Sequence, residues 1–380
     1  MRYRRLGKTG LDVSEIGFGA EWMGGGKTPE EVRAVAEALR VGGVNILDCW
    51  MADPEIRDNL GFALRGHRDD WIIQGHIGST WQDGQYVRSR DMSVVKPAFE
   101  DLLARLGTDH VELGMIHYVD SVDEYRAVMA GPFMEYVRGL KAAGTVGHVG
   151  LSTHNPDVAQ RAAESGEIGM IMFSLNPAFD MMPASENLDD LFGEYDESLE
   201  GIDPARERLY ATCEREDVGI TVMKGYAGGR LLDAQTSPFG VALSPVQCVH
   251  YALTRPAVAS IMVGAKDVAE AQAALAYEGA TEEERDYASV LAGAPRHAYY
   301  GQCTYCGHCA PCAVGIDIAM VNKLHDLAAL HDEVPPSVRA HYHDLAVTAD
   351  ACVGCHACEP RCPFGVRIAE RMEQTAELFA

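Results

Sequence analysis

Cysteines near the C-terminus are the residues of this chain with the most specific chemistry. Eight of them form two short runs, Cys303, Cys306, Cys309 and Cys312, followed by Cys352, Cys355, Cys358 and Cys362. The second run has the spacing C-x2-C-x2-C-x3-C-P, in which three thiolates bind one iron–sulfur cube and the fourth reaches a neighbouring cube. Gaps of two residues let the backbone curl around a cube and present three sulfurs to three irons.

Two such runs predict two [4Fe–4S] clusters with crossed ligation. We assign one cluster to a first quartet, Cys303, Cys306, Cys309 and Cys362, and the other to a second quartet, Cys312, Cys352, Cys355 and Cys358. Zinc sites usually use paired C-x2-C units, and disulfides are uncommon in a chain without an export signal. We therefore expect iron and electron transfer. Cys213 and Cys248 lie in helix-like stretches and are predicted to be buried small hydrophobic residues.

Length and composition limit the classes of partner. The chain has 380 residues, enough for a large domain, placed at residues 1–295, and a small one at 296–380. No apolar run approaches the ~20 residues that span a bilayer, and the N-terminus lacks the apolar region of a signal peptide. We expect a cytoplasmic protein with no membrane partner. A formal net charge of −24 argues against nucleic acid. That charge would suit docking to a basic surface on an electron-transfer protein, such as a ferredoxin or flavoprotein, or simply solubility.

Short apolar runs alternate with helical patterns from residue 14 to residue 277. The predicted strands are Ser14–Gly19, Asn45–Asp48, Trp71–His76, Val111–His117, Gly147–Ser152, Gly169–Asn176, Gly219–Lys224 and Ala259–Gly264. The predicted helices include Pro29–Val41, Val94–Arg105, Val122–Ala143, Pro204–Glu216 and Ser244–Thr254. Such alternation over about 250 residues is typical of an α/β protein with a (β/α)8 TIM barrel. A doubly wound sheet is disfavoured because no G-x-G-x-x-G turn follows the first strand. The small iron–sulfur domain should be mostly helical.

Two further segments do not follow this alternation of strands and helices. Residues 183–204 are strongly acidic and too long for an ordinary connection, so they form either a lid over the site or a solvated surface excursion. Between the cysteine runs, residues 325–348 are predicted to be helical around a break at Pro335 and Pro336.

Polar residues gather where the predicted barrel strands end. Asp48 and Asp53 follow the second strand, and His76, His117 and His154 end or follow the next three. Catalytic residues of such barrels lie at this C-terminal face. Because Asp48, His76 and His117 leave adjacent parallel strands at equivalent depth, we expect them to converge. Asp53 directly precedes Pro54, so a helix N-cap is the alternative to a catalytic role.

Several segments of the chain resemble aldo-keto reductases, and specifically a bacterial branch with a C-terminal two-cluster ferredoxin-type domain. These segments are Tyr3–Gly19, Gly43–Asp48, Leu106–Leu113, Ile116–His117 and Gly150–Ser152. The resemblance implies an oxidoreductase in which Asp48 and His117 match two members of the family's catalytic tetrad. The family's catalytic Tyr falls on Asp53 and its Lys on His76. The usual proton donor and the group that lowers its pKa are thus both replaced.

The resemblance also implies a site for NADP(H). The candidate cofactor-binding residues are Ser152, Asn176, Lys224, Gly225, Gly264 and Lys266, with Lys266 in the loop that binds the cofactor phosphate. Some of the family's cofactor-binding residues are replaced in this chain. Met172 stands where the family has a Gln that binds the nicotinamide carboxamide, and Ala273-Ala274 stand where it has a Glu-Asn pair.

Three functions remain open from the sequence. The first is an iron–sulfur oxidoreductase that uses NADP(H) on a small carbonyl-type or unsaturated substrate, with His76 or His117 as general acid. The second is a nicotinamide-independent reductase that receives electrons through the clusters, with or without a flavin. The third is a metal-assisted lyase or isomerase in which Asp48, His76 and His117 hold a divalent ion. Aromatic residues predicted to line the pocket, Trp50, Trp81 and Tyr118, suggest an apolar or aromatic small molecule.

Overall fold

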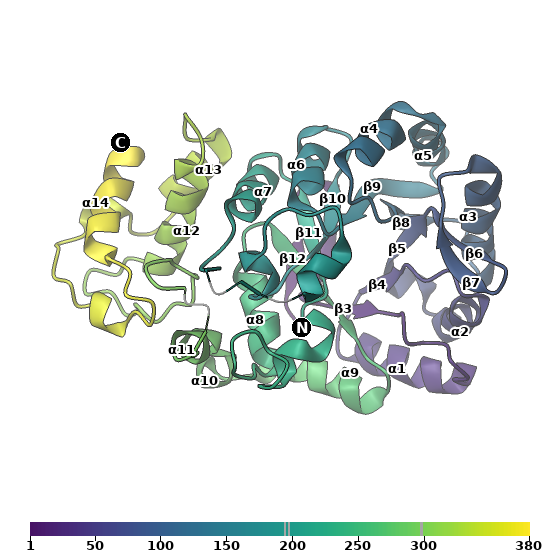
Figure 1. The fold of residues 1–380 in the computed structure, drawn as a ribbon, viewed down its shortest axis with the longest axis horizontal. Coiled ribbons are helices and arrows are strands. Elements are labelled where there is room, and N and C mark those ends of the chain that lie inside the picture. Colours follow the sequence, from purple (N-terminus) through teal and green to yellow (C-terminus); the bar gives the residue numbers. More distant parts are fainter. Residues whose placement is uncertain (194, 197, 297–298) are drawn as a thin grey trace.

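The computed structural model describes residues 1–193, 195–196, 198–296 and 299–380 (Figure 1). Two acidic residues of the 183–204 segment, Glu194 and Glu197, lie outside the described residues. The predicted boundary between residues 295 and 296 adjoins a second such gap and stays a prediction.

Eight parallel strands close into a barrel, which confirms the predicted α/β barrel. In chain order they are β3 (Ile16–Gly19), β4 (Ile46–Cys49), β5 (Ile72–Ile77), β8 (Val111–Ile116), β9 (Val146–Thr153), β10 (Met170–Ser174), β11 (Gly219–Met223) and β12 (Val258–Gly264). Each strand pairs with its neighbour in the chain, and β12 pairs with β3. All eight strands that the sequence predicts are therefore in the sheet.

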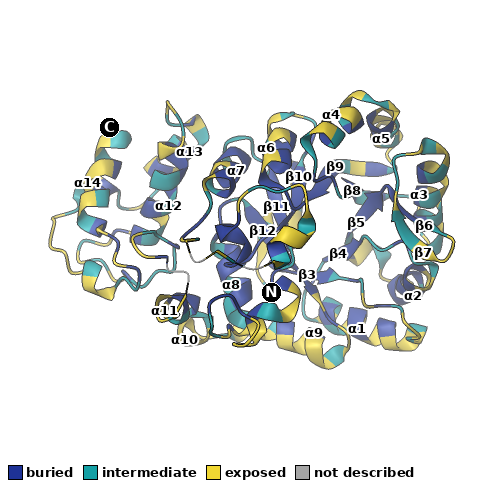
Figure 2. Cartoon of the chain, in the orientation of Figure 1, coloured by how far each residue is buried: buried dark blue, intermediate teal, exposed yellow. Residues whose placement is uncertain are grey.

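Helices surround the barrel and cover its outer face (Figures 1 and 2). They are α1 (Pro29–Val41), α2 (Pro54–Leu64), α3 (Met92–Leu106), α4 (Val122–Ala130), α5 (Pro132–Ala142), α6 (Pro156–Glu164), α7 (Pro204–Arg215), α8 (Pro245–Thr254) and α9 (Val268–Leu275). The local sequence explains how α1 forms. Thr28 and Glu31 make a reciprocal capping box around Pro29, and the buried side chains recur at the helical spacing that faces the core.

One helix prediction is wrong in its extent. Residues 122–143 form two helices, because Gly131 adopts an extended backbone with ψ of −178° and Pro132 begins α5. Glycine has a low helix propensity, and proline is favoured in the first turn of a helix.

Two short hairpins flank the barrel at opposite ends. Strands β1 (Tyr3–Arg5) and β2 (Asp12–Ser14) pair antiparallel, and Leu6 and Val13 pack with Ile46 and Leu113 in one buried cluster. Strands β6 (Ser79–Gln82) and β7 (Gln85–Arg88) follow β5 and were not predicted. Their connection is Asp83-Gly84, whose positive φ values of 50° and 77° match a two-residue hairpin turn.

The cysteine-rich part forms a helical unit beside α7 and α8 (Figure 1). Its helices are α12 (Ile318–Ala329), α13 (Pro336–His343) and α14 (Ile368–Leu378), preceded by α10 (Glu282–Arg285) and α11 (Tyr287–Ala292). The predicted break at Pro335 and Pro336 is confirmed, although α12 begins and ends earlier than expected. Throughout the described part of the chain, no helix is long and apolar enough to cross a membrane.

Candidate active site

Asp48, His76 and His117 meet at the C-terminal end of the barrel, as their positions predict. Asp48 lies opposite Gln74 in the β4–β5 register, His76 lies opposite Met115, and His117 directly follows β8. His76 Nε2 lies 2.9 Å from Asp48 Oδ1, and His76 Nδ1 lies 2.8 Å from His117 Nδ1. All three side chains are buried. They therefore form one hydrogen-bonded unit.

A tyrosine that the sequence analysis missed extends this unit into the cavity. The hydroxyl of Tyr86, on β7, lies 2.6 Å from His117 Nε2. Neutral tautomers satisfy the whole series when Tyr86 donates to His117, His117 Nδ1 donates to His76, and His76 Nε2 donates to Asp48. The signal that would have found Tyr86 is the Asp83-Gly84 turn, which is a strong hairpin pattern.

Burial and nearby charges keep His117 and Tyr86 uncharged at physiological pH. Burial, with His76 and the two arginines 88 and 90 nearby, holds the pKa of His117 well below its usual range. Burial raises the pKa of Tyr86 to about 12. Asp48 Oδ1 also accepts from Gln74 Nε2 at 2.9 Å. In the resting protein His117 is therefore neutral, and Tyr86 holds its proton.

The two ends of the β6–β7 hairpin are tied to the barrel. Ser79 Oγ donates to the Trp50 carbonyl at 2.5 Å, and Arg88 Nη1 donates to the Tyr118 carbonyl at 2.9 Å. The Trp50 ring stacks on His117 at 5.9 Å and meets Tyr86 edge-on at 5.4 Å. Tyr118 has a positive φ of 48°, which is uncommon for an aromatic residue, and its ring also lies edge-on to His117. These contacts hold the Tyr86 hydroxyl and the His117 ring together.

A cavity of about 520 Å³ opens over these side chains. That volume is within the usual range of small-molecule sites. Asp48, His76, Tyr86 and His117 line one end of it, and the other end is lined by residues that follow β11 and β12. Leu188, from the acidic 183–204 segment, also contributes to the wall, and the choice between a lid and a surface excursion stays a prediction.

Comparison with known proteins identifies the architecture. The aldo/keto reductase family profile matches residues 15–244, more than half of the chain. The chain belongs to the aldo/keto reductase family. An uncharacterized oxidoreductase, YqkF of Bacillus subtilis, is 27% identical over 282 residues, which cover 70% of this chain and 88% of that protein.

Solved structures show the same barrel. The aldo-keto reductase AKR11C1 of Bacillus halodurans is 22% identical, with a TM-score of 0.58 over 75% of this chain and 94% of that one. A structure of a putative aldo-keto reductase from Pseudomonas aeruginosa is 25% identical, with a TM-score of 0.55 over 73% and 94% of the two chains. At these identities the structural likeness supports the fold.

Most of the predicted cofactor residues of this aldo/keto reductase line the cavity. They are Ser152, Lys224, Gly225, Gly264 and Lys266. The Lys266 ammonium lies 4.8 Å from the Trp22 ring, beside Gly264, where a Cβ would meet the indole at 3.1 Å. Two family replacements, Met172 and Ala273-Ala274, also line the cavity, as does Met223. The cavity wall therefore has the cation Lys266 at the predicted phosphate end. At positions 172, 273 and 274, where the resemblance implies amide and carboxylate side chains, the wall has apolar ones.

Two predicted site residues lie outside the lining of this cavity. Asp53 Oδ1 accepts from the Glu55 backbone N–H at 2.9 Å and caps α2, which supports the N-cap alternative rather than a catalytic role. Asn176 is buried, and its side chain bonds the backbone of Lys224, Ala178 and Phe179. Its contact to Lys224 supports the cavity wall from behind.

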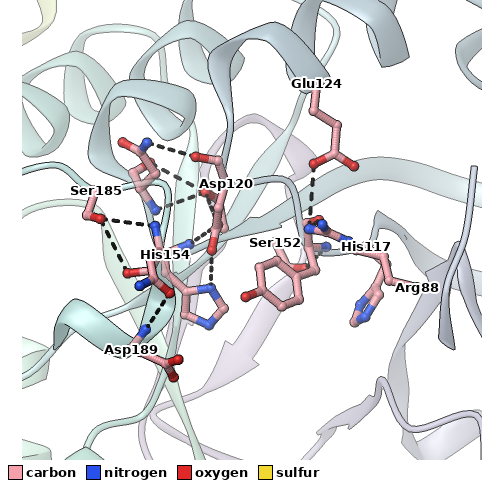
Figure 3. A network of polar contacts seen from close by, with 12 residues as sticks. Arg88, His117, Asp120, Glu124, Ser152, His154, Ser185 and Asp189 are labelled. Atoms are coloured by element: carbon pink, nitrogen blue, oxygen red, sulfur yellow. Dashed lines mark hydrogen bonds and ion pairs between the residues drawn. The ribbon is translucent and has the colours of Figure 1, made fainter. Parts of the chain in front are cut away.

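His154 belongs to a separate polar network at the cavity edge (Figure 3). Its Nδ1 lies 2.8 Å from Asp120 Oδ2, and its backbone N–H donates to the other carboxylate oxygen at 2.7 Å. Ser152 Oγ accepts from the Tyr118 N–H at 2.8 Å. These contacts fix the backbone around Tyr118.

The described residues give no support to the metal-assisted alternative at the mouth. No three of their His, Cys, Asp or Glu side chains are close enough together to share a single ion. The facing nitrogens of His76 and His117 are directed at each other, so they have no common vertex for a ligand.

Each predicted cysteine quartet surrounds its own small cavity. The first quartet lines one cavity together with Phe364, Val366 and Ile368, and the second quartet lines another with Ile316, Ile318 and Met372. Four thiols around an apolar cavity are the donor set that a [4Fe–4S] cluster requires. The crossed grouping matches the expected assignment, including Cys312 and Cys362, so the residues present fit two clusters.

Proposed function

We propose that this chain is an iron–sulfur oxidoreductase that acts on a small carbonyl-type or unsaturated molecule at the barrel mouth. The hydrogen-bonded series from Tyr86 to Asp48 carries this proposal, because it ends in a phenol at the cavity wall. A tyrosine is the proton donor expected from the family resemblance. Tyr86 supplies that group from the β6–β7 hairpin, whereas position 53 holds a capping aspartate.

Proton transfer follows the order of the hydrogen bonds. In the oxidative direction, Tyr86 takes the proton of a substrate hydroxyl while its own proton passes to His117 Nε2, and His76 and Asp48 stabilise the charge that forms. In the reductive direction, Tyr86 gives its proton to the substrate oxygen and recovers one from solvent in the cavity. This assigns His117 to accept the proton of Tyr86 in the oxidative direction, and His76 and Asp48 to orient the His117 ring.

NADP(H) is the cofactor we propose for the other end of the cavity. Bound there, it would supply or accept the hydride while Tyr86 handles the proton, which balances the conversion of a carbonyl to an alcohol. Ser152, Lys224 and Gly225 line the inner wall, and Lys266 provides the positive charge for a phosphate group.

The two quartets are proposed to hold two [4Fe–4S] clusters. Such clusters would supply one-electron transfer; two electrons from an outside ferredoxin or flavoprotein, together with one proton, would be equivalent to the hydride that NADP(H) supplies. Cys355 of the second quartet is exposed, and Val353 beside it is 66% exposed. This exposure supports the second quartet as the proposed point of contact with an outside protein.

A second candidate function dispenses with the nicotinamide. Met172, Met223 and Ala273-Ala274 line the cavity, so amide and carboxylate groups expected from the family are missing. In this version, two electrons would reach the substrate one at a time, each entering at the second quartet and passing through the first, with or without a flavin in the cavity, and both protons would come by way of Tyr86.

The experiment begins with protein purified anaerobically. NADPH binding is measured by fluorescence, and a panel of aldehydes, ketones and activated alkenes is then tested with NADPH or with a reduced ferredoxin. Tight NADPH binding and turnover that is lost in Tyr86→Phe would support the first function. Turnover with the reduced ferredoxin alone would support the second. Turnover that is fully retained in Tyr86→Phe would contradict both.

A further inference from the structure

One buried arginine joins the barrel to the first quartet. Arg255 is the C-cap residue of α8 and is 1% exposed. Its Nη2 donates to the carbonyl of Thr304, which lies between Cys303 and Cys306. The hydroxyl of Tyr287 donates to the same carbonyl at 2.6 Å. The barrel thus directs a guanidinium at the backbone that carries two cluster ligands.

Among the described residues, Arg255 forms no ion pair, and Asp180 and Glu207 act on it only from beyond contact distance. Within the described part of the chain, its Nε and Nη1 have no hydrogen-bond partner. Its guanidinium lies over the rings of Tyr251 at 4.6 Å and Tyr305 at 4.9 Å. The buried carboxylate of Asp180 accepts hydrogen bonds from the hydroxyls of Tyr210 and Tyr251 and forms an ion pair with Arg206 at 3.6 Å.

Burying a cation without a paired anion is costly, so buried charges are normally paired. A thiolate-held cluster in the first quartet would supply the missing negative charge. One added electron makes that charge more negative, so a fixed cation stabilises the reduced form more than the oxidised form. Arg361, which donates to the Cys309 carbonyl at 2.5 Å, is exposed, so solvent screens its charge more strongly.

We infer that Arg255 is a positioning residue that raises the reduction potential of a [4Fe–4S] cluster in the first quartet relative to one in the second. This inference rests on the proposed iron–sulfur function. Electrons that enter at the exposed second quartet would then come to rest at the first quartet, beside the barrel. Charge, burial and hydrogen bonding near the ligands are the factors that set the reduction potential of such a cluster.

Contacts lead on from Arg255 toward the cavity. The Tyr251 hydroxyl lies 3.5 Å from that of Tyr299, which donates to the Pro177 carbonyl at 2.5 Å. The neighbouring Asn176 donates to the Lys224 carbonyl at 2.9 Å, and Lys224 lines the cavity. These contacts connect the first quartet to the barrel mouth through packed protein.

The test is a redox titration of anaerobically purified protein with dithionite and one-electron mediators, followed by electron paramagnetic resonance. The signal lost in Cys306→Ser identifies the first quartet. We expect Arg255→Met to lower the ratio of reduced to oxidised first cluster about tenfold at a fixed potential, equivalent to a shift of ~59 mV for one electron. The second cluster should be unchanged.

Two further variants separate charge from structure. Arg255→Lys keeps the charge and should shift the potential of the first cluster less than Arg255→Met does. If the Met variant loses iron, the Lys variant still shows how far the several N–H donors of the guanidinium contribute to that potential. Arg57→Met removes an equally buried arginine on α2, which bonds the Ala98 carbonyl at 3.0 Å, and it should leave both potentials unchanged. Full iron with unchanged potentials in both Arg255 variants, or an equal shift of both clusters, would overturn the inference. Wild-type protein without iron would instead overturn the proposed function on which it rests.

Discussion

The imidazoles of His76 and His117 meet through their Nδ1 atoms at 2.8 Å, in the buried end of the cavity. Only one of the two facing nitrogens can carry the proton of this bond. Because His76 Nε2 is directed at Asp48, the bridging proton belongs to His117, and His117 Nε2 is left to accept from Tyr86. This pairing sets the direction of the whole series.

Tyr86→Phe is predicted to reduce kcat by about 10²–10⁴-fold, the usual contribution of a positioned acid or base. Only the hydroxyl is removed, so the ring should keep its edge-on contact with Trp50 and the melting temperature should hold. Steady-state kinetics on any substrate found in the panel provides the measurement. Tyr300→Phe, which changes a side chain that is 80% exposed, is the matched control. Equal rates in the two variants would remove Tyr86 from the chemistry.

Asp53→Asn is predicted to leave both rate and melting temperature unchanged, because asparagine caps a helix as well as aspartate does. Asp48→Asn should instead lose most activity, since it weakens the acceptor of two hydrogen bonds, from Gln74 and from His76. The comparison uses kcat and thermal melting of both variants. A large rate loss in Asp53→Asn at unchanged melting would return Asp53 to the catalytic set.

Lys266→Met is predicted to weaken NADPH binding by about tenfold to about a hundredfold, the worth of a hydrogen bond to a charged group. The methionine keeps an apolar stem against Trp22 but loses the ammonium. Fluorescence titration measures the affinity, and Lys141→Met on the far end of α5 serves as control. Unchanged affinity in Lys266→Met would place the cofactor phosphate elsewhere.

His250 makes stability fall with acidification. Burial lowers its pKa to about 4, whereas an unfolded histidine titrates near ~6.5. Between pH ~6.5 and about 4, His250 is protonated in the unfolded chain but not in the folded chain. The free energy of unfolding therefore declines as the pH drops through this range. His250→Gln should flatten this decline, measured as the urea midpoint from tryptophan fluorescence. The exposed His341→Gln should not, and identical slopes in both variants and wild type would contradict the assignment.

The barrel and the convergence of three mouth residues could be predicted from the sequence. Short apolar runs bounded by helices are typical of a parallel barrel, and residues at equal depth on adjacent strands must converge. Asp48, His76 and His117 meet for this reason. The break at Gly131 was overlooked because the apolar spacing continues on both sides of it.

Tyr86 was not predicted because its role depends on closure in three dimensions. It lies ten residues beyond His76, and only the folding back of β6 and β7 brings its hydroxyl to His117. Arg255 was missed for a similar reason. Its partner Thr304 is distant in the sequence, and its importance comes from burial without an ion-paired carboxylate among the residues that the structure describes.

The cluster chemistry is the central claim, and iron content tests it most directly. Anaerobically purified protein should contain about eight irons and about eight acid-labile sulfides per chain, as two [4Fe–4S] clusters require. Cys306→Ser and Cys355→Ser, one in each quartet, should each lose iron. Cys213→Ser and Cys248→Ser, both buried in barrel helices, should keep it. Zinc in place of iron, or full iron in both quartet variants, would contradict the account.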